Sequence, residues 1–185
     1  MSIRIETEKN SIERAAELLE GVPNGFQTAL SRALNRALQE GRTEGVRAVT
    51  KQYTVKARDV RPTFRMQRAT KNDLDAELSS RGANLELTKF SHRPQTDTTG
   101  NKRKQVRVGV KKGGLKPLGQ AFVYNGRIFQ RLGAARLPVQ LKFGNAVPVM
   151  LDNDKVVDKI VDTMGKSVDK RITHETERLL SGAVK

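Results

Sequence analysis

Hydrophobic residues repeat with a helical period in two long stretches of the chain. In residues 26–53 one helical stripe contains Phe26, Leu30, Ala33, Leu34, Ala37, Leu38, Gly41, Val46 and Val49. The second stretch follows Asp152 and Asn153, either of which is a suitable N-cap. Such spacing places the apolar side chains on one face of a helix. The pattern therefore predicts a long amphipathic helix in the N-terminal half and another at the C-terminus.

Between the two helices the hydrophobic period shortens towards two. Val106, Val108 and Val110 alternate with polar or small residues, which predicts a strand over residues 105–111 with one buried face. Weaker alternation marks three further candidate strands, residues 63–70, 75–80 and 85–90. The middle of the chain is therefore expected to form antiparallel sheet.

The dipeptide Asn125-Gly126 gives the clearest turn signal. It separates two short apolar runs, Ala121–Tyr124 and Arg127–Gln130, and both turn residues tolerate the positive φ of a type I′ hairpin. The order of helix, strands and helix predicts an α+β fold. In that fold an antiparallel sheet packs against the long N-terminal-half helix and the C-terminal helix.

The remaining segments are expected to be loops or arms. Residues 91–104, rich in Thr, Gly, Pro and charge, are predicted to be a long mobile loop, and residues 133–148 an irregular connection. We expect residues 1–20 to form an N-terminal arm and residues 21–185 a single domain, since one core serves a chain of this size. No apolar stretch resembles a signal peptide or a membrane span, so a soluble protein made in the cytoplasm, without a membrane partner, is expected.

Positive charge is concentrated in the middle of the chain. The net charge is +15, and residues 21–71 carry eleven Lys and Arg against three acids, whereas residues 150–185 carry seven of each sign. A field of this sign favours a phosphate backbone or an acidic protein surface, and the sequence leaves both partners open. The candidate contacts lie on and beside two loops: Lys102, Arg103, Lys104, Lys111, Lys112 and Lys116.

No pattern in the chain predicts catalysis. There is no Cys, and His92 and His174 are expected to be solvated surface residues. The tripeptide Gly165-Lys166-Ser167 lacks the upstream Gly of a phosphate-binding loop, because Ile160 occupies that position. The sequence therefore predicts a non-enzymatic protein without a catalytic site, metal or cofactor.

Residues 121–139 carry a resemblance to a known family. The segments Ala121-Phe122-Val123, Gly126 to Arg131, Gly133 and Arg136-Leu137-Pro138-Val139 resemble the signature of phage minor tail protein Z. The helix segment Ala33 to Ala37 and the pair Val147-Pro148 before the final helix are similar to the same family, so the resemblance covers residues 26–180.

The resemblance implies a structural virion protein that completes the upper end of a phage tail and joins it to the head connector. Such proteins are expected to form a ring, hexameric in this reading, around the DNA channel in the neck of the virion, after assembly in the host cytoplasm. The implied partners are further copies of the chain, the tail terminator or tail tube protein, the head connector proteins and the packaged DNA nearby.

The interface residues implied by the resemblance are Phe129, Arg131, Gly133, Arg136, Leu137, Pro138 and Pro148. Arg131 and Arg136 bracket a glycine-containing turn, where a guanidinium group can tie its own fold or clamp a neighbour. Both roles stay open from the sequence. The alternative function is that of a sequence-independent nucleic-acid-binding protein, because the net charge alone favours polyanions.

Overall fold

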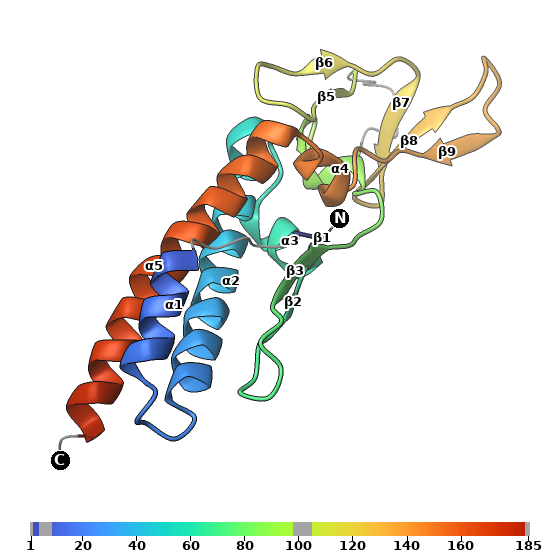
Figure 1. Ribbon diagram of the computed structural model, residues 1–185. Helices are drawn as coiled ribbons and strands as arrows, with labels where there is room; N and C mark the ends of the chain where they lie inside the picture. Colours follow the sequence, from blue (N-terminus) through green and yellow to red (C-terminus); the bar gives the residue numbers. More distant parts are fainter. Residues whose placement is uncertain (1, 4–8, 98–104, 184–185) are drawn as a thin grey trace. The chain divides into compact units, whose positions relative to one another are not determined.

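The computed structural model describes residues 2–3, 9–97 and 105–183, and Figure 1 shows it as a ribbon. It contains five α-helices among these residues: α1 (Lys9–Leu18), α2 (Gly25–Gln52), α3 (Ala57–Val60), α4 (Val147–Leu151) and α5 (Asp154–Ala183). Two short 3-10 helices, η1 (Arg61–Thr63) and η2 (Leu87–Lys89), lie between the strands in the chain order. The two long helices confirm the two amphipathic patterns.

The described strands form three small antiparallel sheets. Their order is β1-β3-β2, β4-β5-β6 and β7-β8-β9. The strands are β1 (Ser2–Ile3), β2 (Phe64–Gln67), β3 (Glu77–Ser80), β4 (Ser91–Arg93), β5 (Arg107–Gly109), β6 (Lys116–Pro117), β7 (Ala121–Tyr124), β8 (Arg127–Arg131) and β9 (Val139–Leu141). The fold is therefore α+β, as predicted, with its strands distributed over three sheets.

The chain divides into two units, each built from separate segments. The helical unit comprises Met1–Gly45, Phe64–Arg81 and Asp152–Lys185, and the sheet unit comprises Val46–Thr63 and Gly82–Leu151. The prediction of an arm over residues 1–20 followed by a single domain stays a prediction.

Close packing on α2 holds the helical unit together. A Cβ atom built on Gly41 would lie 2.4 Å from Met164 Sδ of α5, and one on Gly45 would lie 2.7 Å from Phe64 Cζ of β2. Only glycine permits such short approaches, because any side chain would displace these neighbours. The two glycines, which weaken the helix in isolation, thus let α5 and β2 pack directly against its backbone.

Helix α1 joins the same unit through α5. Figure 1 shows the two helices side by side, and Ser11 Oγ donates a 2.6 Å hydrogen bond to an Asp169 carboxylate oxygen of α5. The first turn of α5 is capped by Asn153, whose Oδ1 accepts a 3.1 Å hydrogen bond from the Lys155 backbone N–H. The predicted N-cap is therefore confirmed at Asn153.

The sheet unit contains the predicted hairpin. Tyr124 pairs with Arg127 across the turn, and Asn125 and Gly126 have φ values of 49° and 69°. This confirms the type I′ signal, because both central residues adopt the positive φ that such a turn requires.

Three local predictions in this unit were wrong. Residues 85–90 do not form a strand: Leu87–Lys89 is a 3-10 helix, and only Glu86 makes an isolated bridge, to Phe143. The predicted loop over residues 91–104 begins with strand β4, which pairs with β5, and the irregular stretch 133–148 contains β9. These conformations depend on pairing with strands distant in the sequence, which local sequence patterns do not predict.

Candidate interaction surfaces

The loop between β8 and β9, residues 132–138, is exposed at every position. Figure 1 shows it extending past the ends of the two strands. Leu132 and Leu137 keep 63% and 68% of their surface exposed. Among the described residues, five of the seven large exposed apolar side chains belong to β7, this loop, β9 or the residues just after β9: Tyr124, Leu132, Leu137, Val139 and Phe143.

Hydrogen bonds hold the base of this β8–β9 loop. The Leu132 backbone N–H donates to the Pro138 carbonyl at 3.2 Å, and the Arg131 N–H donates to the Gln120 carbonyl at 3.1 Å. Beside them the Phe122 and Phe129 rings stack with centroids 5.9 Å apart. The loop thus presents apolar side chains from a hydrogen-bonded base.

The residues implied by the family resemblance fall into three places. Gly133, Arg136, Leu137 and Pro138 lie together in the β8–β9 loop, where all four are exposed. Phe129 and Arg131 lie in β8, both half-buried. Pro148 lies apart from the loop, in α4.

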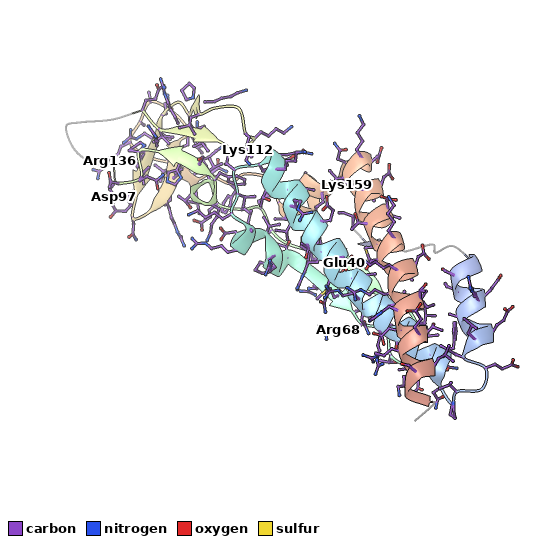
Figure 2. The ribbon with its side chains drawn as sticks, turned by 90° about the vertical axis from the view of Figure 1, so that its left-hand side faces the viewer. Glu40, Arg68, Asp97, Lys112, Arg136 and Lys159 are labelled. Atoms are coloured by element: carbon purple, nitrogen blue, oxygen red, sulfur yellow. The ribbon has the colours of Figure 1, made fainter. Side chains whose placement is uncertain are left out.

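The two arginines of the motif have different surroundings. The Arg131 guanidinium carbon lies 5.1 Å from the centre of the Phe122 ring, so this side chain contacts its own sheet through a cation–π interaction. Arg136 lies in the exposed loop (Figure 2).

All of the excess positive charge belongs to the sheet unit. Over the segments of that unit the sequence carries 18 Lys and Arg against 3 acids, whereas the segments of the helical unit carry 17 of each sign. The +15 net charge of the chain is therefore the charge of the sheet unit alone.

Each of the three acids in the sheet unit already has a partner. Asp59 lies 3.1 Å from Lys89 Nζ, and Glu86 lies 3.7 Å from Arg127 Nε. Asp97 accepts a hydrogen bond from the Gly126 N–H at 3.4 Å. Only 3 acids therefore face the 18 cations of the unit, and two of these acids are already in ion pairs.

Two arginines face each other across the β4-β5-β6 sheet. Arg93 of β4 is the cross-strand partner of Arg107 of β5, and both side chains are exposed. Among the described residues, no ion pair is recorded for either. The pair is not visible in the sequence, because the two arginines lie far apart in the chain and only the register of β4 with β5 brings them together.

The predicted loop lysines lie close to this sheet. The Lys112 N–H donates to the Gln52 carbonyl at 2.8 Å, which places it beside the end of α2 (Figure 2), and Lys111 pairs with Tyr53 in an isolated bridge. Lys116 lies in β6, and all three lysines are exposed. Lys102, Arg103 and Lys104 lie outside the described residues.

His92 differs from its predicted solvated position. It lies in β4 and is buried, with Nδ1 2.9 Å from the Phe90 carbonyl oxygen, whereas His174 is exposed on α5 as expected. Within the described part of the chain, no three His, Asp or Glu side chains gather as metal ligands would, and no helix is long and apolar enough to cross a membrane.

Comparison with known protein families gives one match. A family model described as prophage minor tail protein Z matches residues 10–181 of the 185 residues. Comparison with curated proteins and with solved structures found no match.

Proposed function

Because the chain belongs to the prophage minor tail protein Z family, and is thus a structural component of a phage tail, we propose that it completes the upper end of the tail and joins it to the head connector. The family match confirms the resemblance carried by residues 121–139. In this role the protein binds other virion components and catalyses no reaction.

The exposed β8–β9 loop is the observation that carries the proposal. Its apolar residues, Leu132 and Leu137, project from an ordered sheet and are not used by the fold itself. A partner that covers them removes apolar surface from water, which favours association. The loop is therefore the proposed contact with a neighbouring virion protein.

We propose that six copies form a ring around the DNA channel in the virion neck. A loop that binds a different surface on the next copy makes a head-to-tail interface, and repetition of such an interface closes a ring when the rotation fits. The outer faces of this ring would contact the tail terminator or tail tube protein on one side and the head connector proteins on the other.

Complementation of a phage that lacks this gene tests the proposal. We expect the double variant Leu132→Ser, Leu137→Ser to retain the parent's circular dichroism spectrum but to leave most tails unjoined to heads, counted by electron microscopy. The matched control is Leu18→Ser, which changes a half-exposed leucine of α1. Normal joining by the loop variant, or absence of the parent protein from purified virions, would contradict the proposal.

A sequence-independent nucleic-acid-binding protein is the second candidate function, and the 18 cations against 3 acids of the sheet unit favour it. Its distinguishing result is a protein that coats DNA in infected cells and is missing from purified virions. The family membership favours the tail role as the first candidate.

A further inference from the structure

We propose that the β4-β5-β6 sheet binds the phosphate backbone of duplex DNA, with Arg93 and Arg107 as its central contacts. This assigns a partner to the basic surface and goes beyond the joining role proposed above. It does not require ring formation, since each copy carries the whole surface.

The cross-strand arginine pair is the first argument. Side chains directly opposite in an antiparallel pair have Cβ atoms about 4.5–5.5 Å apart, and like charges in that arrangement destabilise a sheet. Arg93 and Arg107 occupy such a pair, while the three acids of their unit are engaged elsewhere. An external anion between the two guanidinium groups removes the repulsion, and phosphate oxygens match their fork of donors.

The loop after β5 brings further cations close to the sheet. Gly109 faces the same way as Arg107, because side chains two residues apart in a strand share a face. A Cβ atom on Gly109 would lie only 2.7 Å from the Gly114 carbonyl oxygen, so the backbone of the loop is folded against that face. This loop carries the exposed Lys111 and Lys112, whereas Lys116 of β6 is paired with Val108 and so belongs to the other face of the sheet.

The composition of the surface favours DNA over an acidic protein. Protein surfaces generally intersperse both signs of charge, whereas duplex DNA presents one negative charge per about 1.7 Å of its axis and no positive ones. A unit with 18 cations and 3 acids is complementary in charge to duplex DNA.

The same surface favours duplex over single-stranded DNA. Proteins that bind single strands use exposed aromatic rings on which bases stack. Strands β4, β5 and β6 contain Ser, His, Arg, Val, Gly, Lys and Pro, and the only ring among their non-proline residues, that of His92, is buried. Phosphate contacts without stacking are characteristic of backbone recognition in duplexes.

Fluorescence anisotropy of the full-length protein with a labelled duplex of mixed sequence tests the inference. We expect the logarithm of affinity to fall linearly with the logarithm of NaCl concentration. Arg93→Gln and Arg107→Gln should each reduce the magnitude of that slope by about 0.9, and the double variant by about 1.8. The double variant should also lose about tenfold or more in affinity near physiological salt.

The matched control is Arg65→Gln, which neutralises an exposed strand arginine of the helical unit, opposite Ser79. It should leave both affinity and slope unchanged. Thermal unfolding provides a second readout: loss of the like-charge pair should leave the melting temperature of Arg107→Gln equal to or above that of the parent. A purely structural arginine would instead lower it on removal.

Three results would overturn the inference. One is an unchanged salt slope in the double variant, and another is tighter binding of a single strand than of the duplex. The third is displacement of the duplex by polyglutamate at equal charge concentration, which would assign the surface to acidic proteins. Complementation with the double variant, scored for heads joined to tails, tests the joining role independently of DNA binding. Heads and tails can still join when the variant no longer binds DNA.

Discussion

The helical unit and the sheet unit carry almost the same number of positive charges, 17 and 18, and differ in their acids, 17 against 3. In the helical unit cations meet acids on neighbouring helices: Arg32 lies 3.1 Å from Glu175, and Lys159 of α5 (Figure 2) pairs with the buried Glu44 of α2. The basic character of this protein therefore arises from the scarcity of acids in one unit rather than from an accumulation of bases.

The two units also differ in what they do with apolar side chains. Six of the seven large exposed apolar residues in the described chain belong to the sheet unit, and only Leu18 belongs to the helical unit. The helical unit carries equal numbers of cations and acids and, among its described residues, exposes one large apolar side chain. Because the proposed contacts with partners lie in the sheet unit, we expect substitutions to affect stability in the first unit and binding in the second.

A matched pair of leucine truncations should give the largest contrast. Leu38 of α2 has no exposed surface, whereas Leu137 of the β8–β9 loop keeps 68% of its surface exposed. We expect Leu38→Ala to lower the free energy of unfolding by about 2–5 kcal/mol, because it removes buried methyl groups and leaves a cavity. Leu137→Ala should change it by less than about 0.5 kcal/mol.

Denaturant unfolding followed by circular dichroism measures both variants. Equal losses would contradict the division of roles, because they would mean that Leu137 is part of the folded core. The count of heads joined to tails gives a second comparison. Leu137→Ala should impair joining although the protein stays folded.

A glycine pair on the two long helices tests close packing within the helical unit. Gly45→Leu should destabilise by about 1–3 kcal/mol, because its Cβ would lie 2.7 Å from Phe64 Cζ and the ring must move. A Cβ atom on Gly165 of α5 would meet no atom within 4 Å. Gly165→Leu should therefore stabilise the protein by about 0.8 kcal/mol, because Leu has the better helix propensity. Opposite shifts in thermal midpoint are expected, and a loss in both variants would contradict the packing argument.

The sequence could predict those features that depend on local patterns. The helical period located α2 to within one residue at each end and predicted α5 after its N-cap, and Asn125-Gly126 located the hairpin. Strand β4 could not be found this way, because Ser-His-Arg has no strand pattern and is held by pairing with β5. Residues 85–90 resembled a strand, yet only Glu86 finds a cross-strand partner, Phe143, in an isolated bridge.

The residues of the candidate interaction surfaces were predicted in part. The family resemblance pointed to Arg136, Leu137 and Pro138, which the structure places in one exposed loop, and it also included Pro148, which lies apart in α4. The arginine pair was not predictable, because it depends on the register of two strands separated by residues 94–106. Charge counts along the sequence also missed the neutrality of the helical unit, since its three segments lie far apart in the chain.

Neutralising one lysine in each unit should give the smallest effect. It is also the sharpest test of the charge comparison, because stability should fall for the lysine of the helical unit and rise for the lysine of the sheet unit. Lys166 lies 2.7 Å from Asp162 one turn away on α5, so Lys166→Gln should cost about 0.3–0.5 kcal/mol. Lys116 is exposed in a unit of excess positive charge and has no recorded ion pair among the described residues, so Lys116→Gln should stabilise by a few tenths of a kcal/mol, roughly within the range of surface substitutions. Thermal unfolding at low salt measures both, and high salt should shrink both differences because it screens exposed charges. A destabilised Lys116→Gln at low salt would mean that the cations of the sheet unit are already compensated within the fold, and the contrast between the units would then fail.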